Sequence, residues 1–361
     1  MPKSPAPPPA VAPPDIERSD GLNRLVTATA EGRVVPGVRH CLLRIEDPTW
    51  PAGWSTAAAT HHRNAVRPDP DTAFRIASVT KMITATTVLA LTDQGRCRLD
   101  DPAAAHLPAD VVDRLPLDGR AGPGTVTIRQ LLDHTSGLPD FFSHPAIWAA
   151  IRHGGGRRRF TPHDLLDLAA DAAPSFPPGT GRAYTDTGFV LAGLLVEHLT
   201  RAPLHEAYRT LVLDPAGMDA TWLESSADVP RRRRMLAHDL DGRDITDMDP
   251  TVDWAGGGLV STAADLARFL RALTGGRLLS REAWRAMTRW RPGPAGYYDD
   301  YGLGLGRYRT AAGPLVGHHG VWGAFAFWAP GLDAIITGTV SRARVDRRPL
   351  LEAIAATLLS A

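Results

Sequence analysis

The stretch IASVTKMITATTVLALTDQG, residues 76–95, holds the residue that decides how this chain is interpreted. The chain has 40 lysines and arginines, and only two of them, Lys3 and Lys81, are lysines. An ordinary surface charge in this chain is therefore expected as arginine. Arginine keeps its proton in proteins, whereas a buried lysine can release it. Lys81 is thus interpreted as a lysine that serves proton transfer.

Ser78 lies three residues before Lys81, so on a helix the two side chains share one face. We expect a short strand at 74–78 and then a helix from Ser78 to Gln94 that ends at Gly95. In the first turn of a helix, backbone N–H groups point outward and favour negative charge. A serine becomes a strong nucleophile when a neighbouring base, such as a neutral lysine, removes its proton. A serine here is also a common helix cap.

The composition is that of an ordinary globular protein. The chain has 361 residues, of which 22% are charged and 43% are hydrophobic. Its net charge of +1 gives no reason to expect a nucleic acid or an anionic membrane as a partner. The two cysteines, Cys41 and Cys97, match no metal-ligand spacing, which excludes a cysteine-based zinc or iron–sulfur site. These features do not indicate an oligomeric state.

Residues 1–20 are rich in proline, and we expect them to form an extended, disordered arm. They contain no apolar run that could serve as the core of a signal peptide. No other segment approaches the roughly 18 apolar residues of a membrane span. The expectation is therefore a cytoplasmic protein without a membrane partner.

Strand patterns occur near both ends of the chain, and helical patterns dominate between them. Helices are expected at 23–32 and 347–360, and the middle region carries apolar residues at helical spacing. Strands are expected at 38–47, 53–60, 313–319, 323–330 and 333–340. This order predicts an α+β fold, in which an antiparallel sheet built from the N- and C-terminal segments is flanked by helices.

The same pattern predicts a second lobe that is all-helical. We expect an α/β lobe made of residues 21–100 together with 251–361, and a helical lobe made of residues 101–250. A cleft between two such lobes is a natural place for a small-molecule site. We therefore expect the active site in that cleft.

FRIASVTKMITA, residues 74–85, resembles the nucleophile segment of the penicillin-interacting serine enzymes. These enzymes share S-x-x-K, a second polar motif, and a strand that ends in K-T-G. Over residues 22–340 the chain resembles their branch of class C β-lactamases, D,D-carboxypeptidases and β-lactamase-fold esterases. The other segments that match in order are GRCRLDDPAAAHLP (95–108), TIRQLLDHTSGLPDF (127–141), FPPGTGRAYTDTGFVLAGLLVE (176–197), AGGGLVSTAADLARFL (255–270), YGLGLG (301–306) and VGHHGVWGAF (316–325).

The resemblance implies a role for each matching residue. Ser78 corresponds to the acylated nucleophile and Lys81 to its activating partner. Tyr184 corresponds to the tyrosine of Y-x-N, which relays protons and can act as a base only if cations stabilise its charged form. His318 corresponds to the first residue of K-T-G or H-T-G, and is expected to hold a substrate carboxylate or to tune Tyr184. Whether Lys81 or Tyr184 is the base stays open.

Further residues are expected to bind the substrate. The resemblance implies that the backbone N–H groups of Ser78 and Val321 form the oxyanion hole. Gly320 is expected to let a substrate lie against the strand. Trp322, which adjoins that strand, is a stronger candidate than Trp148 for lining an apolar pocket.

Two residues depart from the family pattern. Asp186 stands where the family has the asparagine of Y-x-N, and an ionised aspartate offers only hydrogen-bond acceptors. His319 stands where the family has the threonine of H-T-G. Both changes favour an activity other than that of a dedicated β-lactamase.

Weaker candidates have simpler explanations. Asp133-His134 could belong to a Ser-His-Asp triad, but in the resembling family this histidine is structural. His61-His62 is interpreted as a loop because no carboxylate cluster lies nearby. The alternating glycines of YGLGLG are interpreted as a strand that admits close packing.

The sequence therefore predicts a serine hydrolase that forms an acyl-enzyme on an ester, amide or lactam carbonyl, without a metal or cofactor. An esterase or a D-amino-acid peptidase is favoured, with a small-molecule or peptide acyl substrate. An acyltransferase or peptide cyclase, and a class C-like β-lactamase, stay open as alternatives. A module that binds or senses acyl groups without turnover is the alternative of a different class.

Overall fold

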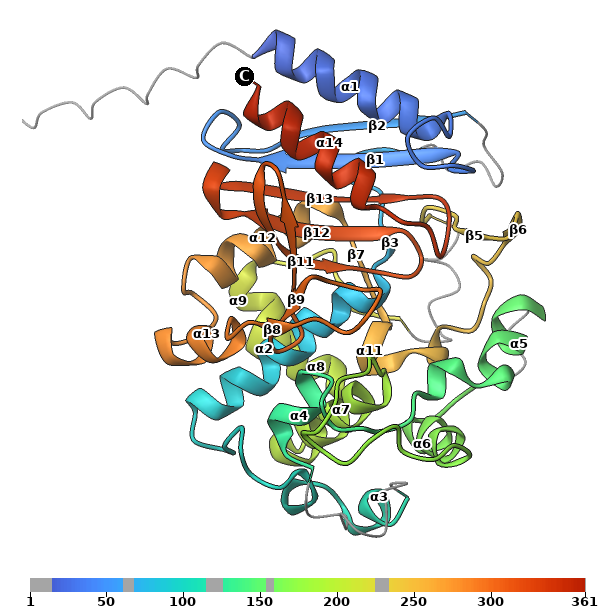
Figure 1. Cartoon of the computed structure of the whole chain (residues 1–361), viewed down its shortest axis with the longest axis vertical. Helices are drawn as coiled ribbons and strands as arrows, with labels where there is room; N and C mark the ends of the chain where they lie inside the picture. Colours follow the sequence, from blue (N-terminus) through green and yellow to red (C-terminus); the bar gives the residue numbers. More distant parts are fainter. Residues whose placement is uncertain (1–14, 61–67, 115–125, 154–158, 225–233, 361) are drawn as a thin grey trace, which may run out of the picture.

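The computed structural model describes residues 15–60, 68–114, 126–153, 159–224 and 234–360. Its main sheet is antiparallel and is formed by β1 (His40–Glu46), β2 (Trp54–Ala59), β8 (Arg291–Pro292), β9 (Asp300–Tyr301), β10 (Gly306–Thr310), β11 (Gly313–His319), β12 (Ala324–Ala329) and β13 (Ala334–Val340). The strand order is β2-β1-β13-β12-β11-β10-β9-β8. Because β1 pairs with β13, the two ends of the chain build one sheet, as Figure 1 shows.

Two smaller sheets also occur in the described part of the chain. One has the order β3-β7-β4, and the other is a two-stranded hairpin. Their strands are β3 (Phe74–Arg75), β4 (Trp222–Leu223), β5 (Asp239–Leu240), β6 (Arg243–Asp244) and β7 (Leu259–Ser261). Since β3 pairs with β7, the segment that leads to Ser78 is tied to the segment that leads out of the helical region.

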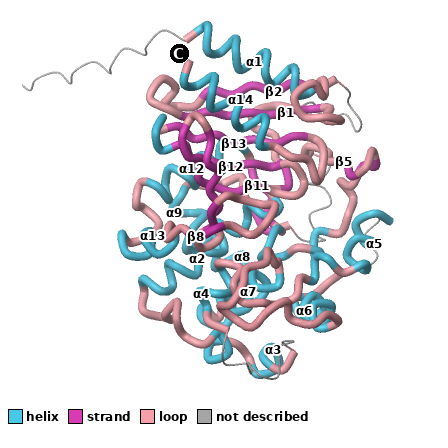
Figure 2. The backbone as a smooth tube through the Cα atoms, in the orientation of Figure 1, coloured by secondary structure: helices cyan, strands magenta, loops and turns pink. Residues whose placement is uncertain are grey.

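Helices cover both faces of the main sheet and fill the rest of the molecule. They are α1 (Ile16–Ala30), α2 (Thr80–Asp93), α3 (Ala109–Val112), α4 (Ile128–Leu132), α5 (Pro145–His153), α6 (Pro162–Ala170), α7 (Thr187–Thr200), α8 (Leu204–Tyr208), α9 (Asp214–Ala216), α11 (Trp254–Gly257), α12 (Ala263–Thr274), α13 (Arg281–Met287) and α14 (Arg348–Leu359). Helices α1 and α14 lie on one face of the sheet, and α12 lies against the other (Figure 1). Figure 2 shows the strands gathered in the upper part and most helices below them.

The fold class expected from the sequence is confirmed. Strands β11, β12 and β13 begin and end within one residue of their expected bounds. All seven residues of β13 are buried, as expected for a central strand that is covered by helices on both faces. In the described part of 101–250 helices are the commonest regular structure, but the region also carries the two-residue strands β4, β5 and β6, so the expectation of an all-helical region is wrong. The division into two lobes stays a prediction. Helix α2 of the expected α/β lobe packs against α11 of the same lobe, and also against α7 and α8 of the expected helical lobe.

The N-terminal helix begins earlier than expected. The structure places residues 16–20 in α1, so the expectation that they belong to a disordered arm is wrong; residues 1–14 lie outside the described part. The side chain of Asp15 accepts a hydrogen bond from the backbone N–H of Arg18 and thereby caps the helix. Gly21 does not interrupt α1, and a Cβ there would lie 3.2 Å from the side chain of Thr357 in α14.

The YGLGLG segment is a turn rather than a continuous strand. Strand β9 ends at Tyr301 and β10 begins at Gly306. Gly304 has a φ of +64°, and a Cβ there would lie 2.7 Å from the carbonyl oxygen of Lys81. The prediction that the glycines of this segment admit close packing is confirmed, because Gly304 lets the turn lie directly against helix α2. No described helix is long and apolar enough to cross a membrane.

Candidate active site

Ser78 lies in a short 3-10 helix, η1 (Ala77–Val79), and not in the first turn of α2 as expected. Ala77 has a φ of +46°, in the left-handed region that residues other than glycine rarely adopt. Such a conformation costs about 1–3 kcal/mol and persists only where its surroundings hold it. The surroundings here are β3 on one side and α2 on the other, which fix the turn that presents Ser78.

The end of strand β11 lies directly against this turn. A Cβ on Gly320 would lie 2.2 Å from the carbonyl oxygen of Ile76 and 2.8 Å from the Cβ of Ala77. Gly320 is therefore required for backbone packing, and the expectation that it also lets a substrate lie against the strand stays a prediction. Because Val321 follows directly, its N–H and that of Ser78 are carried by segments in contact. The oxyanion hole formed by these two N–H groups stays a prediction.

The amine of Lys81 is fully buried and has three acceptors around it. It donates to the Oγ of Ser78 at 3.1 Å and to the backbone carbonyl of Gly256 at 2.8 Å. It also donates to Oδ1 of Asp186, with which it forms an ion pair. An ammonium has three N–H donors and no acceptor. The number of acceptors around the amine therefore equals the number of donors that an ammonium offers.

Tyr184 lies just before α7 and hydrogen bonds with the side chain of Ser78. The amine of Lys81 lies 5.1 Å from the centroid of the Tyr184 ring. Burial raises the pKa of Tyr184 well above its ordinary value, and the charge of Asp186 raises it further. Since these effects exceed that of the hydrogen bond from Ser78, the phenol is protonated at neutral pH. The structure thus brings Ser78, Lys81 and Tyr184 together, as expected.

The Tyr184 ring is held between two other rings. The ring of His134 lies behind it, with centroids 4.3 Å apart, and the ring of Tyr297 stacks on it at 4.2 Å and 4°. His134 is fully buried, and its Nδ1 accepts a hydrogen bond from the N–H of Thr185 at 3.3 Å. Burial lowers the pKa of His134 well below its ordinary value, so the ring is neutral. This histidine supports Tyr184 and belongs to no Ser-His-Asp triad.

His318 lies on the inner side of β11 and is 1% exposed. Its Nδ1 lies 3.0 Å from the hydroxyl of Tyr298, and its Nε2 lies 3.1 Å from the hydroxyl of Tyr301. Burial lowers the pKa of His318 to about 3, and the charge of Lys81 contributes to this shift. A neutral, enclosed ring does not bind a carboxylate, so that expectation is wrong. The ring centroid is 6.3 Å from that of Tyr184, and a tuning effect on Tyr184 stays a prediction.

The neighbouring His319 is the histidine that lines the cavity. Side chains alternate along a strand, so His318 and His319 face opposite sides of β11. The Nδ1 of His319 lies 2.9 Å from the hydroxyl of Tyr308, and its backbone N–H donates to the hydroxyl of Tyr298 at 3.0 Å. Burial lowers the pKa of His319, and the charge of Arg347 lowers it further. His319 therefore presents a neutral ring to the cavity.

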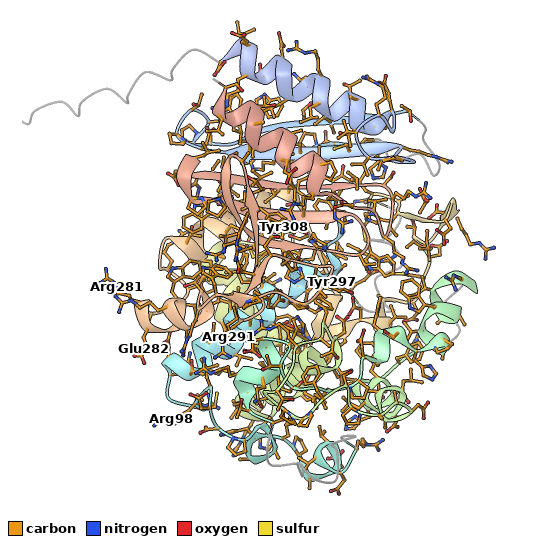
Figure 3. The ribbon with its side chains drawn as sticks, viewed as in Figure 1. Arg98, Arg281, Glu282, Arg291, Tyr297 and Tyr308 are labelled. Carbon is orange, nitrogen blue, oxygen red and sulfur yellow. The ribbon has the colours of Figure 1, made fainter. Side chains whose placement is uncertain are left out.

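Ser78 opens into a cavity of about 340 Å³, a size typical of small-ligand sites. The expected tryptophan is the wrong one: Trp148 lines this cavity, whereas Trp322 is 1% exposed and lies behind the ring of Phe142. The lining residues are Ser78, Asp140, Phe142, Ser143, Trp148, Tyr184, Asp186, Asp253, Gly296, Tyr297, His319, Val321, Arg344, Val345 and Arg347. Figure 3 shows Tyr297 near the middle of the molecule, where the sheet meets the helices.

Three carboxyl groups gather on one wall of this cavity, around a single amine. Besides Asp186, they are Asp140 and Asp253, both of which the sequence analysis missed. The N–H of Asp186 donates to Oδ1 of Asp140 at 2.9 Å. Burial and the charge of Asp186 raise the pKa of Asp140 to about 7, and they raise that of Asp253 well above its ordinary value. The cluster therefore holds protons at neutral pH.

Asp253 is the most unusual member of the cluster. It is 3% exposed, and its Oδ1 has no hydrogen-bond partner among the described residues. A buried polar atom without a partner is costly, and a ligand can satisfy it. Asp140 lies directly before Phe141, the last residue of TIRQLLDHTSGLPDF, and Asp253 lies two residues before AGGGL, but neither position marks the acid as part of a cavity. Although these three acids lie close together, in the described part of the chain no group of three or more histidine, cysteine, aspartate or glutamate side chains has the arrangement needed to hold a metal ion.

Comparison with known proteins identifies the family. The model of the Beta-lactamase family matches residues 22–359, and the chain belongs to that family. The solved structure of a D-stereospecific amidohydrolase from a Streptomyces species has a TM-score of 0.78 at 28% identity, over 92% of this chain and 98% of that one. The resemblance seen in the motifs is thereby confirmed.

Two curated proteins are similar over part of their length. Penicillin-binding protein 4 of Amycolatopsis lactamdurans is 31% identical over 217 residues, which is 58% of this chain and 53% of that protein. Esterase EstB of Burkholderia gladioli is 39% identical over 161 residues, which is 43% of this chain and 40% of that protein. The matched regions thus span about half or less of these curated relatives. Relatives in this family are hydrolases, which supports an enzymatic role for the chain.

Proposed function

We propose that this protein is a serine hydrolase that forms an acyl-enzyme at Ser78 and acts on small amino-acid amides, peptides or esters of D configuration. The contact that supports this proposal is the 3.1 Å hydrogen bond from the buried amine of Lys81 to the Ser78 hydroxyl. A serine held by a lysine and a tyrosine at the wall of a cavity is the arrangement that acyl transfer requires. No cofactor takes part in the proposed reaction.

The acylation step begins with a proton shift. Lys81 in its ammonium form cannot accept the serine proton, so it first passes a proton to the Asp186 carboxylate that it contacts. The neutral amine then takes the proton from Ser78 while the Oγ attacks the substrate carbonyl carbon. The tetrahedral oxyanion would be stabilised by the N–H groups of Ser78 and Val321.

Collapse of the tetrahedral intermediate breaks the bond to the leaving group. Tyr184 is protonated and lies beside Ser78, so it is the residue that we propose to protonate the leaving amine or alcohol. Lys81 then returns its proton to Tyr184. Deacylation repeats these transfers with water as the nucleophile, and it restores the free serine and releases the acid. The number of protons is conserved over the cycle.

The carboxyl cluster favours an acyl group that carries a free amine. Asp140 and Asp253 line the same cavity as Ser78, and Oδ1 of Asp253 is buried without a partner. An ammonium group next to the scissile carbonyl can donate hydrogen bonds to the carboxyl oxygens of these acids, and its charge favours their ionised form. This feature favours amino-acid amides and peptides over β-lactams, whose acyl amine is blocked. The similarity to a D-stereospecific amidohydrolase supports the same substrate class.

The proposal is tested by mass spectrometry of the intact protein after exposure to a panel of D-alanine esters and amides, neutral esters and β-lactams. We expect a transient mass increase equal to the acyl group and turnover of the D-alanine compounds. Ser78→Ala is expected to abolish both effects, whereas Ser360→Ala, which removes an exposed serine at the end of α14 and outside the cavity, keeps them. Stable stoichiometric labelling without turnover would instead identify a sensing module.

Acetylation of the substrate amine tests the substrate class separately. The charge-assisted bonds to the carboxyl cluster are then lost, and we expect kcat/KM to fall by at least about tenfold. Equal rates on free and acetylated D-alanine amides would overturn the role of the cluster, while leaving Ser78 as the nucleophile.

A further inference from the structure

Of the three acceptors around the Lys81 amine, the backbone carbonyl of Gly256 is the one that does not take up a proton. It lies in α11, a helix of only four residues. A helix this short is not stable alone, so its position depends on the elements around it. Helices α2 and α7 pack against it near the middle of the molecule (Figure 1). The contacts that hold α11 therefore also place an acceptor beside the amine.

Two glycines allow α11 to lie this close to its neighbours. A Cβ on Gly193 of α7 would lie 2.6 Å from the Cβ of Ala255. A Cβ on Gly256 would lie 2.8 Å from Oδ1 of Asp186 and 3.5 Å from Nζ of Lys81. The backbone of α11 is thus packed directly against α7 on one side and against the ion pair on the other.

Thr84 ties α2 to α11. It lies three residues after Lys81 on α2, so the two side chains share one face of the helix. Its side chain is fully buried, and its hydroxyl donates to the carbonyl oxygen of Ala255 at 2.7 Å. The carbonyl oxygen of Thr80, in its own helix, is farther away at 3.3 Å. Because Ala255 directly precedes Gly256, this bond fixes the segment that carries the acceptor of Lys81.

Two neighbouring threonines of α2 behave differently. Thr86 and Thr87 are also fully buried, but each donates to the carbonyl four residues earlier. The distances are 2.7 Å to Met82 and 2.9 Å to Ile83. This is the usual local bond of a threonine inside a helix. Thr84 therefore departs from the pattern of its neighbours, and its shorter bond goes to another helix.

The hydroxyl of Tyr208 completes the contact. It lies 2.5 Å from Oγ1 of Thr84. A threonine hydroxyl has one hydrogen, and because that hydrogen is directed at Ala255, Tyr208 is the donor. Tyr208 is fully buried at the end of α8, and burial raises its pKa above the ordinary value, which keeps the phenol protonated. The hydrogen bonds therefore run in one direction, from Tyr208 through Thr84 to Ala255.

We propose that Thr84 and Tyr208 are positioning residues for Lys81. They hold the carbonyl of Gly256 against the amine and thereby aim the amine at Ser78. An amine with three fixed acceptors has one orientation, whereas loss of one acceptor lets it turn away from the serine. A misplacement of about 1 Å in a catalytic group can cost about 10²-fold in rate. This role rests on the proposed function, because both residues act through Lys81.

The test compares two threonine variants of the same helix. Thr84→Val nearly keeps the shape of the side chain and removes the hydroxyl. We expect it to lower kcat for D-alanine p-nitroanilide by at least about tenfold, with KM changed by less than about threefold. Thr86→Val is the matched control, because it removes an equally buried hydroxyl that bonds within α2, and its kcat should stay within about twofold of wild type. Thr84→Ser, which restores the hydroxyl, should recover most of the lost rate.

Tyr208→Phe removes only the oxygen that donates to Thr84. We expect a smaller loss of kcat than in Thr84→Val, because the bond from Thr84 to Ala255 stays. Adding Tyr208→Phe to Thr84→Val should cause no further loss, since both substitutions act through one contact. Losses that multiply in the double variant would contradict a shared role.

Two further results would overturn the positioning role. One is a kcat of Thr84→Val within about twofold of the wild-type value. The other is an equal loss of kcat in Thr84→Val and Thr86→Val, which would reflect a general loosening of α2. If Thr84→Val does not fold, Tyr208→Phe decides: a lower kcat at unchanged KM supports the role, and an unchanged kcat overturns it.

Labelling with a fluorophosphonate separates this inference from the proposed function. The reagent reacts with activated serines whatever their substrate: Oγ of Ser78 bonds to phosphorus, fluoride leaves, and Lys81 takes the serine proton. If the wild-type protein is not labelled and no D-alanine compound is turned over, the proposed function fails and the positioning role fails with it. If the wild-type protein and Thr84→Val are labelled at the same rate, only the role of Thr84 fails.

Discussion

Lys81 and Asp186 form a buried ion pair although they lie 105 residues apart in the chain. The pair joins α2 to the start of α7, beside the serine that Lys81 also contacts. In the family pattern the position of Asp186 carries an asparagine, which could accept a hydrogen bond from Lys81 but could not take its proton. The chemistry of this site therefore differs from that pattern at the residue next to the amine.

Asp186→Asn tests this relationship. We expect the substitution to lower kcat/KM for D-alanine amides more than for esters without an amine, because it removes both a proton acceptor and one charge of the carboxyl cluster. The melting temperature should also fall, because the buried amine of Lys81 loses its charged partner although the amide has nearly the same shape. The measurement is kcat/KM for both substrates together with the melting temperature. Identical substrate profiles for the two proteins would contradict a role in substrate contact.

Lys81→Arg should be nearly as damaging as Ser78→Ala. The positive charge is kept, but arginine does not release a proton to allow base catalysis. Because general-base catalysis contributes about 10²–10⁴-fold, we expect a loss of that size in kcat. The assay is ester hydrolysis at saturating substrate. Retention of more than about a tenth of the wild-type rate would refute the proton-transfer role.

The pH dependence of stability should report on Asp140. Its pKa is raised from 3.8 to about 7 in the folded protein, so between these values the folded state holds a proton that the unfolded chain has lost. The free energy of unfolding should therefore decrease as the pH rises through this window and level off above it. Asp140→Asn should flatten this part of the curve. Urea titrations between pH 4 and 8 measure both curves, and parallel slopes would argue against the assignment.

The ring of Tyr297 should hold the ring of Tyr184 in its orientation from the solvent side. Its ring is 43% exposed, yet it stacks on Tyr184 at 4.2 Å. Aromatic pairs of this kind contribute about 0.5–1.5 kcal/mol beyond the area that they bury. Tyr297→Ala should therefore lower kcat by roughly tenfold, whereas Tyr297→Phe, which keeps the ring, should stay near the wild-type value. Equal rates for the two variants would indicate that the stack has no influence on Tyr184.

Gly320→Ala should disrupt the turn that presents Ser78. The added Cβ would overlap the carbonyl oxygen of Ile76, which is backbone and cannot move away cheaply. Overpacking typically costs about 1–3 kcal/mol, so we expect a lower free energy of unfolding and a lower kcat. Gly331→Ala is the matched control, because nothing lies within 4 Å of a Cβ there. Similar stability of the two variants would contradict the packing role of Gly320.

Much of the fold could be predicted because its strands are local patterns. Short apolar runs bounded by turn residues mark β11, β12 and β13. The bounds of these three strands follow from the local sequence, whatever the strands contact in the folded protein. The contact between Ser78 and Lys81 followed from their spacing of three residues. The junction with Tyr184 did not follow from spacing, and only the family resemblance supplied it.

The remaining features of the site could not be predicted, since they depend on residues far apart in the chain. Asp140, Asp186 and Asp253 come from three segments, and no single segment indicates that they share one cavity. The direction in which His318 and His319 face depends on the register of β11 in the sheet, which the sequence alone left undetermined. The positive φ of Ala77 likewise reflects how β3 and α2 are held, not the preference of alanine.

The complete burial of Lys81 has a practical consequence for attaching this protein to surfaces or dyes. The sequence contains one other lysine, Lys3, near the amino terminus. Reagents that target primary amines cannot reach the enclosed side chain of Lys81. Labelling through amines therefore leaves the amine that contacts Ser78 unmodified in the folded protein.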